Sequence, residues 1–253
     1  MSSIRVKFTR GDEVKYISHL DMMKAFERAL RRSGLPISYS QGFNPHPKMV
    51  FGLPLSVGVT SEAEYADFEL EEIIETREFM ERLNSQLPSG LKIIDAREKK
   101  TKGNIMAEIC RASYSIRVIS EKDTSLEEIN KGIEQFMNKQ EIIVKKETKS
   151  KVKDTDIRKM IFFMQVLPLD LTKNKTSYNM TLENMTSENC SNKKTMYELK
   201  LTLSAGSKAN LKPELLIEAF NSVSGQKLII KKIHRTELFV DINGKASDPM
   251  IVC

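Results

Sequence analysis

The sequence predicts an α+β protein built from two ferredoxin-like halves packed together, each with its elements in the order βαββαβ. Two observations predict this fold. Segments in which apolar residues alternate are interleaved with segments in which they recur at helical spacing. The same order of segments also occurs on both sides of residues 101–104 (TKGN). The length of 253 residues is sufficient for two domains of ordinary size.

The first half opens with a strand and a clearly bounded helix. Residues 4–8 (IRVKF) alternate as in a half-buried strand. Ser18, followed three residues later by Asp21, predicts a helix N-cap, and Gly34 predicts the C-terminal end of that helix. Its buried face is predicted from apolar residues at helical spacing, which are Leu20, Met23, Phe26, Ala29 and Leu30.

The remaining segments complete the first half. Short apolar segments at 36–39 and 48–55 precede an acidic strand at 65–70, a helix at 77–87 and a strand at 91–94. We therefore expect a first domain over residues 1–100, which carries a basic helix and a proline-rich loop.

The second half repeats the order. We expect a second domain over residues 105–241, with a polar insertion at about 170–195 and a frayed tail at 242–253. Its expected elements are strand 113–119, helix 125–138, strands 141–146, 158–167 and 196–204, helix 213–223 and strand 227–233.

Charge is unevenly distributed along the chain, whose formal net charge is +6. Residues 1–50 have an excess of bases, whereas residues 51–100 have an excess of acids. Residues 145–153 (KKETKSKVK) form a lysine-rich run. This distribution permits an anionic partner without requiring one.

Several functional classes lack their sequence signals. No apolar run approaches the roughly 18 residues of a spanning helix, and the N-terminal residues do not resemble a signal peptide, so we expect a cytoplasmic protein with no membrane partner. The three cysteines (Cys110, Cys190 and Cys253) are far apart, and no nucleotide-phosphate or nucleophile motif occurs. We therefore expect neither a metal nor a cofactor.

Two features predict a surface that binds RNA. Lys24, Arg28 and Arg31 share one face of the predicted helix, and Arg32 extends it. The loop that follows contains two prolines, which restrict its backbone, together with side chains that can stack on a base or pair with one. The candidate loop residues are Tyr39, Gln41, Phe43, Asn44, His46 and Lys48.

A second possibility is a metal-independent ribonuclease. His19 is expected at the first helical position, where the helix dipole lowers the pKa of the imidazole and favours its neutral, basic form. In this hypothesis His19 acts as the base, while Tyr16, His46 or Lys48 stabilises charge. Nothing in the spacing of these residues requires such a site.

The sequence resembles a bacterial family, the radical-SAM-linked proteins. The residues that carry the resemblance are Tyr16-Ile-Ser-His-Leu-Asp21, Ala25–Arg32, Leu35–Lys48, the GLPLSVG segment at 52–58, Ser61 and Glu64-Tyr65. The resemblance implies a working relationship with a radical SAM enzyme, and this chain lacks the CxxxCxxC site of that enzyme itself. In layout, the first half is also similar to CRISPR-repeat endonucleases, which is a similarity of fold.

Three hypotheses remain at this point. The first is a non-catalytic RNA-binding accessory module that works with a radical SAM enzyme in RNA modification or processing, with residues 145–153 as an auxiliary arm. The second is a protein adaptor that docks a radical SAM enzyme through the acidic segment 62–81 or the loop, without nucleic acid. The third is the ribonuclease that uses His19.

Overall fold

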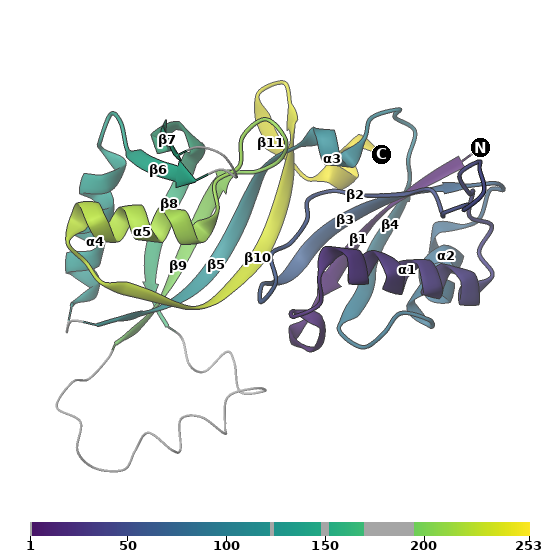
Figure 1. The fold of residues 1–253 in the computed structure, drawn as a ribbon, viewed down its shortest axis with the longest axis horizontal. Coiled ribbons are helices and arrows are strands. Elements are labelled where there is room, and N and C mark those ends of the chain that lie inside the picture. Colours follow the sequence, from purple (N-terminus) through teal and green to yellow (C-terminus); the bar gives the residue numbers. More distant parts are fainter. Residues whose placement is uncertain (1, 122–123, 148–151, 170–194) are drawn as a thin grey trace, which may run out of the picture. The chain divides into compact units, whose positions relative to one another are not determined.

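The chain forms two compact units in a computed structural model that describes residues 2–121, 124–147, 152–169 and 195–253. Unit 1 comprises residues 1–114, 203–210 and 233–253, and unit 2 comprises residues 115–202 and 211–232. Residues of strands β5 (Ile109–Ser120) and β10 (Leu228–Ile242) belong to both units (Figure 1). The predicted α+β class is confirmed.

Unit 1 has the predicted βαββαβ order and a mainly antiparallel sheet. Strand β1 lies between β4 and β3, and β2 pairs with β3 on its other edge, which gives the order β4-β1-β3-β2. On the same edge, β10 pairs with β3 in parallel at Thr60 and Ser61. The six elements are β1 (Ser2–Arg10), α1 (His19–Ser33), β2 (Met49–Phe51), β3 (Thr60–Leu70), α2 (Thr76–Asn84) and β4 (Leu91–Glu98).

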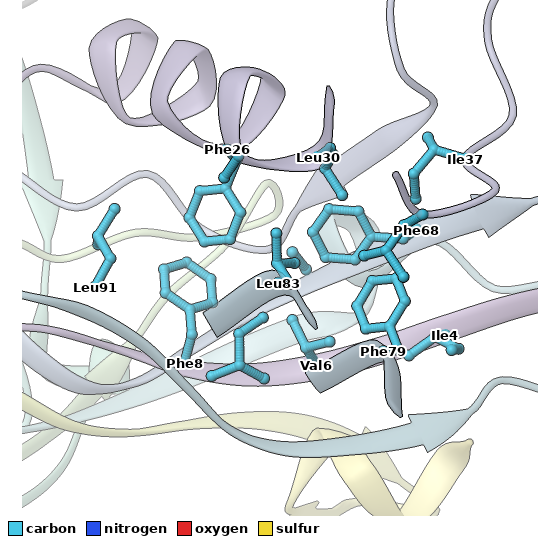
Figure 2. Packing of buried hydrophobic residues seen from close by; sticks show 14 of the residues in the cluster. Ile4, Val6, Phe8, Phe26, Leu30, Ile37, Phe68, Phe79, Leu83 and Leu91 are labelled. Atoms are coloured by element: carbon cyan, nitrogen blue, oxygen red, sulfur yellow. The ribbon is translucent and has the colours of Figure 1, made fainter. Parts of the chain in front are cut away.

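The core of unit 1 lies between the sheet and its two helices. Every second residue of β1 points into it, so that Ile4, Val6 and Phe8 meet Phe26 of α1 and Phe79 of α2 (Figure 2). Neighbouring aromatic rings pack at centroid distances of 5.1–6.2 Å, mostly edge to face or tilted. Each such pair adds about 0.5–1.5 kcal/mol to the free energy of burial. This cluster fixes the position of α1 on the sheet.

Unit 2 has the same order of paired strands, with a hairpin inserted. Its strands follow the order β10-β5-β9-β8, and its helices are in contact through Phe136 and Phe220, whose ring centroids are 5.5 Å apart. Its elements beyond the shared strands are α4 (Leu126–Met137), β6 (Ile143–Glu147), β7 (Val152–Asp156), β8 (Ile161–Pro168), β9 (Met196–Ser204) and α5 (Pro213–Ser224). The short helix α3 (Ile105–Glu108) precedes β5 in unit 1.

The strand predicted at 141–146 is present as β6, but it lies outside the main sheet. β6 pairs with β7 in a separate two-stranded sheet. The edge position in the main sheet is taken by β8, which pairs with β9. Alternation identifies a strand but not its partner, and here the nearest segment supplies the hydrogen bonds.

The predicted frayed tail at 242–253 was wrong. Strand β11 (Lys245–Ser247) pairs with β10, and a 3-10 turn (Pro249–Val252) buries Met250. The carbonyl oxygen of Pro249 accepts a hydrogen bond of 3.0 Å from the buried Arg5 guanidinium, which needs acceptors when it is removed from water. The predicted insertion at about 170–195 lies almost entirely outside the described residues, as does much of the lysine-rich arm at 145–153.

No helix in the described part of the chain is both long enough and apolar enough to cross a membrane.

Candidate nucleic-acid interface

Helix α1 begins and ends at the predicted residues. The backbone N–H of Asp21 donates to Oγ of Ser18 at 3.1 Å, and the Ser18 hydroxyl donates to the Asp21 carboxylate at 2.7 Å. The hydroxyl hydrogen bond is the main cause of a lowered pKa at Asp21, and Lys24 and Arg28 lower it further. At the other end, Gly34 adopts the left-handed conformation with φ of 61°.

The outer face of α1 carries the predicted cations. At 100° per residue, Lys24, Arg28 and Arg31 fall within one narrow sector opposite the buried face, and all three are exposed, as is Arg32. Arg31 pairs with Glu27 at 2.7 Å, and Arg32 donates to the carbonyl oxygen of Gln86 at 2.6 Å. Neither Lys24 nor Arg28 forms an ion pair with another residue that the structure describes.

The buried face of α1 differs from the predicted one. Met22, Phe26, Ala29 and Leu30 are buried, whereas Leu20 is 67% exposed and Met23 is half-buried. Phe26 packs against Phe8 and Phe51, and Met22 lies one turn before it on the same face. The aromatic cluster therefore sets the rotation of the helix and leaves Leu20 in solvent.

The proline-rich loop closes on itself and displays polar and aromatic side chains. The N–H of Ser40 donates to the carbonyl oxygen of His46 at 2.9 Å, and the N–H of His46 donates to Oγ of Ser40 at 3.0 Å. Gly42 has a φ of 127°, which favours glycine. Gln41, Phe43, Asn44 and His46 are exposed, and the Phe43 ring lies fully in solvent.

The two remaining loop candidates, Tyr39 and Lys48, are less available to contact RNA. Tyr39 is half-buried, packs against the core of unit 1 and forms a β-bridge with the buried Pro47. The ammonium group of Lys48 forms a salt bridge of 2.9 Å with Glu69. The exposed side chains of the loop are therefore those of residues 41–46.

Topology places the loop and His19 at opposite ends of α1. The helix returns antiparallel to β1, so its last turn lies at the end of the sheet where the loop leads into β2 (Figure 1). His19 instead packs edge-on against Phe51, at a centroid distance of 5.8 Å. Phe51 is paired with Ala66, whereas Lys48 contacts Glu69, about 10 Å further along β3. The structure thus brings Tyr16 near His19, but not His46 or Lys48.

His19 has an unusual environment. Its side chain is half-buried, and no hydrogen-bond partner of the buried Nδ1 atom occurs among the described residues. Burial lowers the pKa of His19, and the nearby Arg10 lowers it further. The structure therefore supports the predicted lowering of the His19 pKa. Its causes are desolvation and a neighbouring cation, whereas the sequence had suggested the helix dipole.

Three buried charged residues lie under the N-terminal end of α1, and none was predicted. Arg10, Glu64 and Arg235 are at most 4% exposed, and Nε of Arg235 is 3.4 Å from Oε1 of Glu64. Burial raises the pKa of Glu64, while Arg235 and Arg10 oppose the rise. A signal was present in the sequence, because the alternation Ile4-Val6-Phe8 continues to Arg10 on the core face.

Arg10 and Arg235 hold two backbone segments in place, residues 14–17 and residues 53–55. Arg10 donates to the carbonyl oxygens of Val14, Lys15, Ile17 and Leu55 at 2.5–3.5 Å. Arg235 donates to those of Leu53 and Pro54 at 3.3 and 3.4 Å. Carbonyl groups of both loops are thereby turned inward, and the side chains of Tyr16 and Val57 are left exposed.

No group of three or more His, Cys, Asp or Glu side chains is placed to hold a metal ion among residues 2–121, 124–147, 152–169 and 195–253.

A protein-family model matches residues 3–213, which include α1, the loop and the segments over the buried arginines. The chain belongs to this family. It is described as "Uncharacterized protein conserved in bacteria (DUF2344)". The DUF2344 match covers the residues that carried the resemblance noted in the sequence, from Tyr16 to Tyr65.

Solved structures of similar fold exist at low sequence identity. A chain of a Cbf5-Nop10-Gar1 complex is 11% identical with a TM-score of 0.51, over 94% of this chain and 48% of that one. A chain of an archaeal box H/ACA sRNP Nop10-Cbf5 complex is 10% identical with a TM-score of 0.44, over 92% and 46%. The DUF2344 chain thus spans about half the length of these two solved chains, and its likeness to the first is one of fold. No curated protein sequence matches it.

Proposed function

We propose that this DUF2344 protein is a non-catalytic RNA-binding module that works with a radical SAM enzyme in RNA modification or processing. The observation that supports RNA binding most directly is the outer face of α1. Lys24, Arg28 and Arg31 point into solvent from one rigid helix, and two of them have no ion pair with any described residue. Such a row attracts phosphate groups and releases their counterions on binding.

The loop at the C-terminal end of α1 adds groups suited to single-stranded RNA. Unstacked bases of RNA stack on aromatic rings and pair through their exposed edges. The ring of Phe43 is fully exposed, and the neighbouring Gln41 and Asn44 carry amides that can donate and accept hydrogen bonds. The closing hydrogen bonds between Ser40 and His46 limit the ordering cost of binding.

The proposed radical SAM partner rests on the resemblance described above. The residues that carry it lie on α1 itself (25–32), in the segments that flank it (16–21, 35–48 and 52–58) and at Ser61, Glu64 and Tyr65 of β3. A surface shared by RNA and an enzyme would place such residues together around one helix.

Charge reversal on α1 tests RNA binding. We expect Lys24→Glu with Arg28→Glu to weaken binding of a fluorescently labelled, mixed-sequence single-stranded RNA at least tenfold in an anisotropy titration, because phosphate contacts are replaced by repulsion. The logarithm of the affinity of the unchanged protein should fall with the logarithm of salt concentration at a slope of about −2, as expected for three phosphate contacts on a single strand.

The matched control is Arg77→Glu with Lys131→Glu, which changes the net charge equally on exposed residues of α2 and α4. An equal loss in the control would mean that only total charge matters and would contradict an interface on α1. Binding that does not respond to salt would contradict it as well.

One observation favours the adaptor alternative. The loop between β3 and α2 exposes Ile73 between the exposed carboxylates of Glu72 and Glu75, within the acidic segment 62–81. Co-purification from cells separates the two hypotheses. A radical SAM enzyme that stays bound after RNase treatment supports direct docking, whereas one that is lost supports a complex assembled through RNA.

A further inference from the structure

Three apolar side chains are exposed together at the N-terminal end of α1. Tyr16 is 74% exposed, Leu20 67% and Val57 58%. The backbone N–H of Gly58 donates to the carbonyl oxygen of Lys15 at 2.7 Å, and a methyl group at Gly58 would lie 4.0 Å from the Tyr16 ring. The segment that carries Val57 therefore lies beside Tyr16, and Leu20 lies on the first turn of α1, which begins three residues after Tyr16. We call these three residues the Tyr16 patch.

The backbone under the Tyr16 patch is fixed from below. Arg10 holds the carbonyl oxygens of Lys15 and Ile17, on either side of Tyr16, and also that of Leu55, two residues before Val57. Because both segments are held by one buried guanidinium, the patch pays little of the ordering entropy that binding otherwise costs. Solvent-exposed apolar side chains on a rigid backbone are typical of a binding surface.

The charges around the patch indicate what binds there. The ammonium group of Lys15 lies 5.2 Å from the centroid of the Tyr16 ring and also pairs with Asp12 at 3.0 Å, so the cations available to a ligand are those of α1. From Leu20, the exposed face of α1 continues through Lys24 and Arg28 at steps of four residues, or about 6 Å. An aromatic platform that leads directly into a row of cations complements a base followed by its phosphate backbone.

We propose that the Tyr16 patch binds one unstacked base of single-stranded RNA, which stacks on the Tyr16 ring and contacts Leu20 and Val57, while the adjoining phosphates follow Lys24 and Arg28. This inference rests on the proposed function and deepens it, since Leu20 and Val57 were not candidates and Tyr16 was named only for the ribonuclease hypothesis. The RNA then extends along α1 from this patch toward the proline-rich loop that carries Phe43.

The test combines affinity with cross-linking. Tyr16→Ala should weaken binding of the labelled single-stranded RNA by about 5- to 150-fold, the range expected for loss of one stacked base, and Tyr16→Phe should stay within about twofold of the unchanged protein. Irradiation of a 5-iodouridine RNA bound to the unchanged protein should give a cross-link to Tyr16, identified by mass spectrometry of the peptides. The matched control is Phe163→Ala, which removes an exposed aromatic ring from β8.

The outcomes separate this inference from the proposed function. If Tyr16→Ala binds RNA normally while Lys24→Glu with Arg28→Glu does not, the base site is wrong and the RNA-binding function stands. If the unchanged protein binds no RNA, both are wrong. Loss of a co-purified protein from Tyr16→Ala, with RNA affinity unchanged, would assign the patch to a protein partner instead. A urea unfolding curve for each variant excludes an effect through misfolding.

Discussion

Arg10 and Arg235 are charged residues that the core of unit 1 accommodates in different ways. Removing a charge from water costs several kcal/mol unless its hydrogen bonds are replaced. Arg10 replaces them with four backbone carbonyl groups, whereas Arg235 has the Glu64 carboxylate and two carbonyl groups. Both residues therefore couple the folding of the sheet to the placement of the segments at 14–17 and 53–55, whose carbonyl groups they bind.

Removing one partner of the buried pair should be costly. We expect Arg235→Met to lower the free energy of unfolding by about 3 kcal/mol, measured by urea denaturation, because Glu64 is left buried without its ion-pair partner. Arg235→Met combined with Glu64→Gln should recover part of the loss. Arg77→Met breaks an exposed pair with Glu81 and should leave the free energy of unfolding almost unchanged. If Arg235→Met and Arg77→Met change the free energy of unfolding equally, burial adds nothing to the contribution of the pair between Arg235 and Glu64.

His19 should make stability depend on pH. Its pKa in the folded protein lies below the ordinary histidine value of about 6.5, because of burial and then Arg10, so the unfolded chain binds a proton more readily. The contribution of the neutral imidazole is fully present above pH 6.5 and is lost as pH falls below that value toward the folded pKa. We expect the unchanged protein to lose more unfolding free energy than His19→Gln between about pH 7.5 and 5.5. An identical pH dependence of the two proteins would contradict a shielded His19.

At the scale of the element, the stability of α1 depends on the N-cap formed by Ser18 and Asp21. Ser18→Ala removes the acceptor for the Asp21 N–H and should lower the free energy of unfolding by about 1 kcal/mol, measured in urea. Ser18→Asn retains an acceptor and should lie within a few tenths of a kcal/mol of the unchanged protein. A loss as large in Ser18→Asn as in Ser18→Ala would mean that the hydroxyl donated to Asp21 matters more than the cap itself.

The same helix shows where sequence reasoning works and where it stops. Its limits follow from local chemistry, since a capping serine and a C-terminal glycine act within a few residues of the ends. Its rotation does not, because Leu20, Met22 and Met23 are all apolar and only the aromatic cluster around Phe26 decides which one is buried. The exposed cations were predicted, whereas the exposed Leu20 was not.

At the scale of the whole molecule, the order of elements was predictable but some partners were not. Apolar periodicity and the capping and turn residues predicted the βαββαβ order. In both units the strands of this order pair in the same way, as β4-β1-β3-β2 and as β10-β5-β9-β8. The parallel pairing of β10 with β3 involves two residue pairs, which is too short a stretch to be predicted from a sequence pattern. In the buried group, Arg10 could have been placed from the alternation of β1, whereas Glu64 and Arg235 meet only through that pairing and left no such pattern.

The hydrogen bond between Arg5 and Pro249 joins residues 244 positions apart. A ribosome adds about 5–20 residues per second, so Arg5 waits roughly 10–50 seconds for this acceptor after it is synthesised. Through that interval the N-terminal strands lack both this contact and the Arg235 partner of Glu64. Unit 1 therefore matures late during translation, and a nascent chain halted before residue 235 should remain sensitive to protease in the region that unit 1 later protects.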